Sequence, residues 1–88
     1  MITVWKFPLS YLDQFDLEVP RGAEFIHFDF QAGIPTVWAL VNSANSMQRR
    51  SLRMAGTGHE LSAGHDYNHI GSCIDTNTGL VWHLFEEK

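Results

Sequence analysis

The stretch AEFIHFDFQAGIPTVWALVN, residues 23–42, decides the fold of this chain. In its first half apolar and polar side chains alternate, with Ile26, Phe28 and Phe30 on one side and Phe25 on the other. Side chains two positions apart share one face of a β-strand. The alternation therefore predicts a strand whose core face carries the first three of these residues and whose other face meets solvent.

A short turn and a second strand complete this stretch. Residues 32–35, Ala-Gly-Ile-Pro, predict a tight turn. Residues 36–42 are apolar on both faces, as in a strand that lies inside a sheet rather than at its edge. Two such strands with a short glycine-containing turn between them predict an antiparallel hairpin with a central second strand.

Further strand-like runs lie on both sides of the hairpin, and no stretch keeps apolar residues at helical spacing for three turns. We expect them at residues 2–7, 17–19, 49–55, 67–75 and 80–85, with a short irregular or single-turn helical segment at 10–15. The chain is thus predicted to be mainly β, a single small domain over residues 1–88. Its antiparallel sheet is expected to form a compact sandwich or half-barrel of about six strands. Within 67–75, we expect Ile70, Ile74 and Ser72 to face inward together.

Composition bounds the possible functions. With 44% hydrophobic residues and 3 Trp, 2 Tyr and 6 Phe among 88 residues, a small sheet cannot easily cover its own rings, so a homo-oligomer is expected. The net charge of −4 argues against bulk nucleic-acid binding, which needs a broad basic face. One cysteine fits a reducing compartment. Without an apolar run long enough for a membrane span or an export signal, a cytosolic protein with no membrane partner is expected.

Metal and catalytic chemistry have little support in the sequence. On an extended strand His65 and His69 would be roughly 13 Å apart, too far to bind one zinc ion. Cys73 lacks a local feature that would lower its thiol pKa, and His27 with Asp29 form an ordinary outward-facing strand pair. We therefore expect no metal site, no cofactor, no catalytic residue and no enzymatic activity.

The segment from Arg49 to His59 is the best candidate for a binding site. Arg49 and Arg53 would stand on one face of a strand with Ser51 between them, a spacing that suits a phosphate or carboxylate. The Gly-Thr-Gly run at 56–58 permits positive φ, and His59 adds a hydrogen-bonding group. The alternative is a solvated edge strand whose arginines prevent aggregation. The lack of a Gly-Lys-Ser or Gly-Lys-Thr ending excludes a P-loop.

His83 also requires an explanation, because it interrupts the apolar run at 80–85 and its ring must find a polar partner. The two readings are a core histidine bonded to a backbone carbonyl and a ligand contact. Trp38 and Trp82 are expected to be core residues rather than stacking platforms.

Motifs in a fixed order over nearly the whole chain resemble a family of small tailed-phage and prophage proteins described only as a domain of unknown function. The motifs are Trp5-Lys6-Phe7, Val19-Pro20-Arg21-Gly22-Ala23, Gln31-Ala32-Gly33-Ile34-Pro35, Trp38-Ala39-Leu40-Val41, Gly56-Thr57-Gly58-His59, Ile70-Gly71-Ser72 and Val81-Trp82-His83-Leu84-Phe85-Glu86. Residues that match the polar and glycine signature of this family complete the candidate ligand-binding set, which is Gln31, Arg49, Arg53, Gly56, Thr57, Gly58, His59 and His83.

The resemblance implies a small phage accessory protein that works by binding in the host cytoplasm. Together with the Arg49–His59 segment and the many aromatic residues, the resemblance favours a non-enzymatic protein that acts as an oligomer. Such a protein would sequester a phosphorylated small molecule, namely a nucleotide signal of host defence. The alternative is a phage protein that binds and inhibits a host protein through its apolar strands. An enzyme is the third class.

Overall fold

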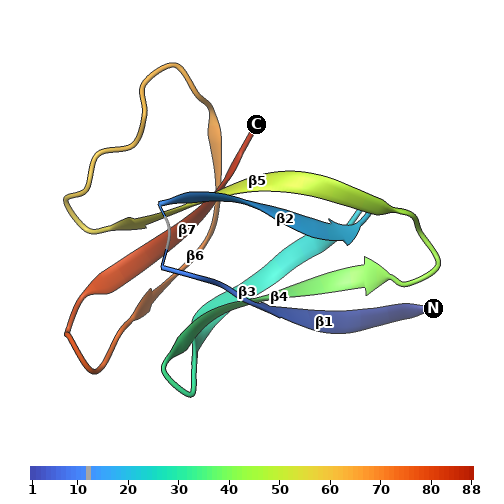
Figure 1. The fold of residues 1–88 in the computed structure, drawn as a ribbon, viewed down its shortest axis with the longest axis horizontal. Coiled ribbons are helices and arrows are strands. Elements are labelled where there is room, and N and C mark those ends of the chain that lie inside the picture. The colour runs from blue at the N-terminus through green and yellow to red at the C-terminus, as the bar shows by residue number, and fades with distance from the viewer. Residues whose placement is uncertain (12) are drawn as a thin grey trace.

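The computed structural model describes residues 1–11 and 13–88, and seven strands form two antiparallel sheets (Figure 1). No helix occurs in this described part of the chain, so none is present that could cross a membrane. The strands are β1 (Ile2–Pro8), β2 (Gln14–Pro20), β3 (Glu24–Gln31), β4 (Ile34–Asn42), β5 (Met47–Gly56), β6 (Tyr67–Ile74) and β7 (Val81–Glu87). The predicted mainly β fold, a compact antiparallel sandwich or half-barrel, is confirmed as two sheets that do not close into a barrel, with seven strands in the described residues in place of about six.

The first sheet has the order β1-β4-β3 and is built on the predicted hairpin. β4 is central, as expected, and pairs with both neighbours. The turn is shorter than predicted, because Gln31 pairs with Ile34 and only Ala32 and Gly33 lie between the strands. Their φ values of 50° and 78° are the left-handed conformation of a two-residue hairpin turn.

The second sheet has the order β2-β5-β7-β6. β2 is longer than the brief strand expected at residues 17–19, because Gln14 and Phe15 already pair with β5. The expected irregular or helical segment at 10–15 includes Leu12, which lies outside the described residues. The last two residues of that segment, Gln14 and Phe15, belong to β2 instead.

Two β-bulges overturn the predicted side-chain directions. In β3 the register shifts between Phe25 and His27, so Phe25 packs on the core while Ile26 is 48% exposed. In β6 the register shifts between His69 and Gly71. An extra residue on one strand moves every later side chain to the opposite face. The prediction that Ile26 faces the core and Phe25 solvent is therefore wrong.

The bulge in β6 has the same effect on the far end of that strand. Ile70 does pack against the core, as predicted. Ile74, in contrast, is 52% exposed and Ser72 is exposed. The prediction that these two side chains face inward is wrong, because it assumed an unbroken alternation along β6.

The core lies between the inner faces of the two sheets. Its buried members come from β3, β4, β5 and β7 and include Phe28, Val37, Leu52, Met54 and Leu84. β3 and β6 approach each other without pairing, and a Cβ at Gly71 would lie 3.2 Å from Cβ of Phe28. Trp82 packs on this core, as predicted, whereas Trp38 is half-buried on the outer face of β4.

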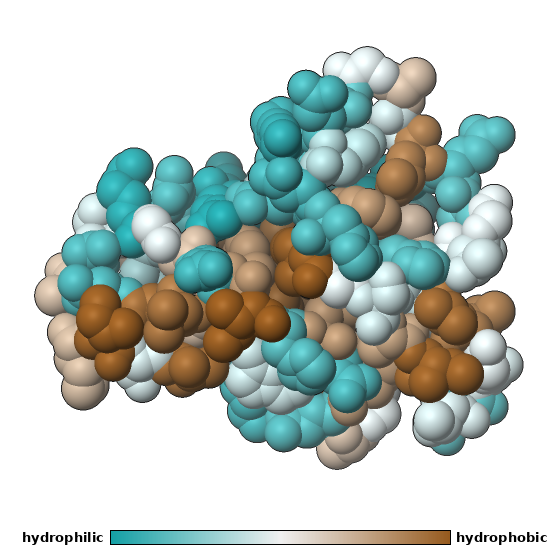
Figure 2. Space-filling view, turned by 180° about the vertical axis from the view of Figure 1, so that it is seen from behind, coloured by the Kyte–Doolittle hydropathy of each residue, from teal (hydrophilic) through white to brown (hydrophobic). Residues whose placement is uncertain are grey.

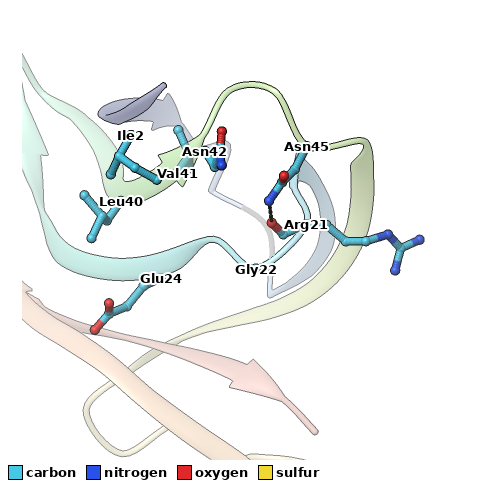
Figure 3. Close-up of a pocket in the computed structure, with 8 residues that line it drawn as sticks. All are labelled: Ile2, Arg21, Gly22, Glu24, Leu40, Val41, Asn42 and Asn45. Carbon is cyan, nitrogen blue, oxygen red and sulfur yellow. Dashed lines mark hydrogen bonds between the residues drawn. The ribbon is translucent and has the colours of Figure 1, made fainter.

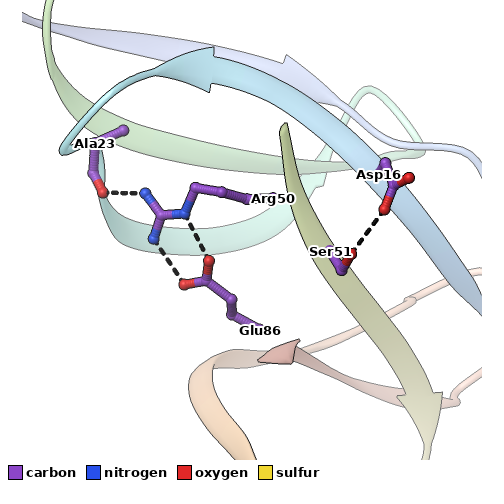
Figure 4. Close-up of polar contacts among 5 residues, drawn as sticks. All are labelled: Asp16, Ala23, Arg50, Ser51 and Glu86. Carbon is purple, nitrogen blue, oxygen red and sulfur yellow. Dashed lines mark hydrogen bonds and ion pairs between the residues drawn. The ribbon is translucent and has the colours of Figure 1, made fainter. Parts of the chain in front are cut away.

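Arg50 joins the two sheets from β5 (Figure 4). Its guanidinium makes two bonds to Glu86 of β7, at 2.6 and 2.7 Å, and donates to the carbonyl of Ala23, the residue before β3. The same group lies 4.6 Å from the centre of the Phe25 ring. Arg50 therefore serves the fold and points away from Arg49 and Arg53, as the alternation of β5 predicts.

Candidate functional site

A cavity of about 280 Å³ lies at the end of β5 and the outer face of β7. Its lining is formed by Ala55, Gly56, Thr57, Gly58, His59, Leu61, His83 and Phe85. Five of the eight predicted ligand-binding residues are in this set, although His83 is distant from the others in the sequence. We call this cavity the Thr57–His83 pocket.

The shape of the loop after β5 depends on His59. The backbone N–H of Gly56 donates to Nδ1 of His59 at 3.1 Å, and the His59 ring meets Trp82 edge-on with centroids 5.7 Å apart. A Cβ at Gly56 would lie 2.8 Å from Cε1 of this ring, so glycine is needed for the imidazole to dock. Because Nδ1 accepts, the neutral ring carries its proton on Nε2 and can donate it to a ligand.

A chain of hydrogen bonds runs beside the pocket from the loop after β5 across β7 to β6. Thr57 Oγ1 lies 2.8 Å from Nε2 of His83, and Ser72 Oγ lies 2.7 Å from Nδ1 of the same ring. His69 Nε2 lies 3.0 Å from the Ser72 hydroxyl. Both nitrogens of His83 are therefore held by hydroxyl groups, which fixes the plane of its ring at the pocket wall.

Protons can be arranged along this chain in two ways. In one, His83 donates from Nδ1 to Ser72, which donates to His69, while Thr57 donates to Nε2. In the other, the direction of these three bonds is reversed and the Thr57 hydroxyl turns to the carbonyl of Val81, 3.5 Å away. Hydroxyl groups that can reverse their bonds can present either a donor or an acceptor to a ligand.

Aromatic rings extend beyond the pocket lining along β7 and β6. Phe85 lies in the lining, and the rings of Tyr67 and His69 lie 5.9 and 5.3 Å from it. Phe85 and Tyr67 are half-buried, so part of their surface stays accessible. Rings in this position can stack on a flat ligand such as a nucleobase.

Arg53 lies next to the pocket on the outer face of β5, opposite Phe85 in the strand register. Its Nη2 donates to the carbonyl of Glu60 at 2.8 Å, which holds the loop over the strand. Its Nε is buried without a hydrogen-bond partner among the described residues. Arg53 thus places a positive charge beside the pocket but does not line it.

The other two predicted residues lie elsewhere. Arg49 is near the opposite end of β5, where its guanidinium is 3.4 Å from Glu18 and both side chains are mostly exposed. Gln31 belongs to the other sheet and accepts a 2.6 Å hydrogen bond from Lys6. Asp16 similarly accepts from Ser51 at 2.8 Å, so acidic residues of β2 neutralise the basic face of β5 (Figure 4).

The backbone of the glycine loop is less available to an anion than the sequence suggested. The N–H groups of Gly56, Thr57 and His59 donate to His59 Nδ1, the Val81 carbonyl and the Gly56 carbonyl. Gly58 has a φ of 89°, the positive value expected for the loop. Side chains, rather than a row of backbone amides, therefore supply most of the polar groups at this pocket.

Sequence reasoning missed Ser72, His69 and Phe85. The bulge in β6 turns Ser72 outward, opposite His83, and no local signal in the sequence marks that bulge. Phe85 could have been found, because it shares a strand face with His83.

A cavity of about 160 Å³ lies between the start of β1 and the turns after β2 and β4 (Figure 3). Its wall includes Arg21, but the guanidinium points away from the cavity, while Asn45 is occupied with the Arg21 carbonyl at 2.8 Å. No group of three His, Cys, Asp or Glu side chains in the described residues is placed to hold a metal ion.

Cys73 is placed for packing rather than chemistry. Burial raises the pKa of its thiol to about 11, with further raising contributions from Asp29 and Asp75 and a lowering one from the N–H of Phe30. The thiol is therefore protonated at neutral pH and a poor nucleophile.

The fold and the site together define a small, two-sheet β protein with an open pocket lined by imidazole, hydroxyl and aromatic groups. A family model described as "Domain of unknown function (DUF7352)" matches residues 1–88, and the chain belongs to this family. Neither a curated protein nor a solved structure matches the chain significantly.

Proposed function

We propose that this protein binds a phosphorylated, nucleotide-like small molecule in the Thr57–His83 pocket without converting it. The observation that carries the proposal is the meeting of Thr57, His59 and His83 around one open cavity with the ring of Phe85 in its wall. Imidazole and hydroxyl groups can bond to phosphate oxygens, and the accessible rings can stack on a base. The charge of Arg53 beside the cavity favours an anion.

The volume of the pocket limits the ligand. Small-molecule pockets usually measure about 300–1,000 Å³, so a cavity of about 280 Å³ suits one nucleotide unit. A cyclic di- or trinucleotide would place one unit here and extend along the Ser72 and His69 side chains or against a second copy of the chain.

The resemblance to small phage proteins gives the proposal a biological setting. In an infected bacterium, a protein that holds a nucleotide signal without turnover would lower the free concentration of that signal and silence the defence that depends on it. Binding without catalysis fits the side chains, because the imidazole of His83 contacts two hydroxyl groups rather than a carboxylate that would support a base.

Isothermal titration calorimetry with inorganic phosphate, nucleoside monophosphates, cyclic dinucleotides and cyclic trinucleotides tests this function. We expect at least one of the nucleotides to bind, and we expect His59→Ala and His83→Ala to weaken it by at least about tenfold, as for a lost charged or directional hydrogen bond. His65→Ala is the matched control, because His65 is an exposed histidine in the same loop that does not line the pocket.

Two results would contradict the proposal. One is that no compound gives a measurable heat of binding or raises the melting temperature of the protein. The other is binding that both histidine variants leave unchanged. Chromatography of the ligand after prolonged incubation separates binding from turnover, and a hydrolysed product would indicate an enzyme. A host protein captured equally well by the wild type and both variants would favour the alternative of a protein inhibitor.

A further inference from the structure

His59 and His83 both line the Thr57–His83 pocket, but their rings have different kinds of hydrogen-bond partner. Nδ1 of His59 accepts from the backbone N–H of Gly56, a group that can only donate. A proton on this nitrogen would point at that N–H, and the bond would be lost. His59 can therefore become charged only if the contact that shapes the loop after β5 is broken.

Both nitrogens of His83 face hydroxyl groups instead. Nε2 lies 2.8 Å from Oγ1 of Thr57, and Nδ1 lies 2.7 Å from Oγ of Ser72. A hydroxyl group can either donate or accept a hydrogen bond. When His83 carries a proton on each nitrogen, Thr57 and Ser72 accept from it and both bonds to the ring are kept. His83 can thus become charged without a change of the surrounding structure.

The hydroxyl protons also have places to go when His83 is charged. Ser72 then donates to Nε2 of a neutral His69, 3.0 Å away. Thr57 accepts from the His83 ring, so its own O–H turns away from that ring. The carbonyl of Val81 is a weak partner for this O–H at 3.5 Å. Because Thr57 lines the pocket, its O–H is available to an anion there.

No carboxylate in the described residues balances a charge on His83. None of their ion pairs includes a histidine of the pocket or of its hydrogen-bond chain. Glu87, on the same face of β7, accepts from Gln14 of β2 at 2.8 Å. Arg53, the charged residue of β5 next to the pocket, is a cation and donates to the carbonyl of Glu60 in the loop. The counter-charge for a proton on His83 therefore comes from an anion in solution.

We propose that anion binding in the Thr57–His83 pocket is coupled to the uptake of one proton by His83. The proton comes from solvent, the charged ring donates to Thr57, and the Thr57 hydroxyl donates to the anion. His83 is then a positioning residue, because it acts on the anion through Thr57. This coupling deepens the proposed function and rests on it for the location of the ligand.

The coupling has a defined sign. Two binding events that favour each other do so by the same factor in both directions. An anion in the pocket therefore makes His83 easier to protonate, and protonation of His83 makes the anion bind more tightly. Imidazole groups change charge between about pH 5 and 8, so the affinity for an anion should rise as pH falls through this range.

The outer face of the β1-β4-β3 sheet offers no comparable place for an anion. Figure 2 shows a band of hydrophobic surface along the part of the molecule that holds β1 and β4. Ile2, Val4 and Leu40 of these strands are 63%, 49% and 38% exposed. Lys6 of β1 is already bonded to Gln31 at 2.6 Å. A small anion is therefore expected at the polar pocket rather than on this face.

Nitrogen NMR of the histidine side chains, recorded between about pH 5 and 8, tests the coupling. The samples contain sodium sulfate or sodium chloride at equal ionic strength, and sulfate is a phosphate-like probe that keeps its charge over this range. We expect sulfate to raise the pH at which His83 becomes protonated by at least about 0.5 unit, which is roughly a threefold change in proton affinity. His65 is the control, because it is exposed in the same loop and does not line the pocket.

Two variants separate the coupling from a merely structural role. Thr57→Val keeps the shape of the side chain without its hydroxyl, so it should abolish the sulfate effect on His83. His83→Gln keeps hydrogen-bonding groups but cannot be charged. Cyclic dinucleotides, whose phosphodiester groups do not titrate in this range, should bind the wild type about tenfold more tightly at about pH 6 than at about pH 8. In His83→Gln the affinity should be the same at both pH values, and thermal unfolding verifies the fold of each variant.

The outcomes distinguish this coupling from the proposed function. Cyclic dinucleotides that bind the wild type equally well at both pH values would overturn the coupling and leave the proposed function standing. Sulfate that affects His83 no more than His65, or a full sulfate effect in folded Thr57→Val, would also overturn it. A sulfate effect at His83 alone, without binding of any nucleotide, would support the coupling and contradict the nucleotide ligand.

Discussion

Ser72 Oγ lies 2.7 Å from Nδ1 of His83, and this contact exists because β6 carries an extra residue at Ile70. The bulge turns Ser72 to the outer face, where it joins His69 to the chain that fixes the His83 ring. The polar side of the pocket is therefore set by a backbone irregularity in a strand that contributes no residue to the pocket lining.

Ser72→Ala should free Nδ1 of His83 and change the ring environment without unfolding the protein. We expect altered imidazole nitrogen shifts for His83 in long-range proton–nitrogen NMR spectra, with a loss of stability below about 1 kcal/mol because the hydroxyl is exposed. Ser51→Ala is the control, since Ser51 bonds to Asp16 elsewhere. Unchanged His83 signals in Ser72→Ala would contradict the hydrogen-bond chain.

Gly56→Ala should displace His59, because the new methyl group would lie 2.8 Å from the imidazole. The ring can swing into solvent, so the fold should persist with a loss of about 1 kcal/mol for the broken hydrogen bond. Any ligand of the pocket should bind as weakly as it does to His59→Ala. Urea unfolding and calorimetry measure the two effects, and wild-type affinity in Gly56→Ala would show that His59 plays no part.

Arg50→Ala and Arg49→Ala should differ strongly in stability. The Arg50–Glu86 side chains are only 19% and 17% exposed, so breaking the pair should cost about 2–4 kcal/mol. The exposed Arg49–Glu18 pair should contribute less than about 1 kcal/mol. Urea unfolding of both variants at low and high salt checks this, and equal losses would mean that Arg50 does not join the sheets.

The Cys73 thiol should resist alkylation in the folded protein at pH 8, because burial raises its pKa from 9.0 to about 11. In the unfolded chain the thiol loses its proton near pH 9, so the free energy of unfolding should fall between about pH 9 and 11. Cys73→Ala lacks this contribution and should show a smaller fall over the same range. Iodoacetamide labelling and unfolding at both pH values test it, and rapid labelling at pH 8 would indicate an accessible thiolate.

Ala32→Asn should stabilise the hairpin between β3 and β4. Ala32 has a φ of 50°, a conformation that is unfavourable for alanine and tolerated by asparagine. A gain of roughly 0.5–1 kcal/mol is expected, while Ala32→Val should be destabilising. Thermal unfolding compares the two, and a gain with valine would be inconsistent with this turn conformation.

The sequence by itself determined the class of fold, the central position of β4 and the grouping of Gly56, Thr57, Gly58 and His59. Hydrophobic alternation and turn residues act over a few neighbouring positions, so they can be read without the rest of the molecule. The same alternation correctly placed Arg50 on the opposite face of the strand from Arg49 and Arg53.

Only the tertiary structure decided what each of these residues contacts. The acidic face of β2 neutralises Arg49, and strand pairing brings His83 to Thr57 across 26 positions of sequence. The bulges at Ile26 and Ile70 lie in the two strands through which the sheets approach each other, with Gly71 against Phe28. Contacts between distant segments depend on register and sheet order, which local patterns do not encode. These contacts leave Arg49 outside the candidate site and bring Ser72 and Phe85 to the predicted Thr57, His59 and His83.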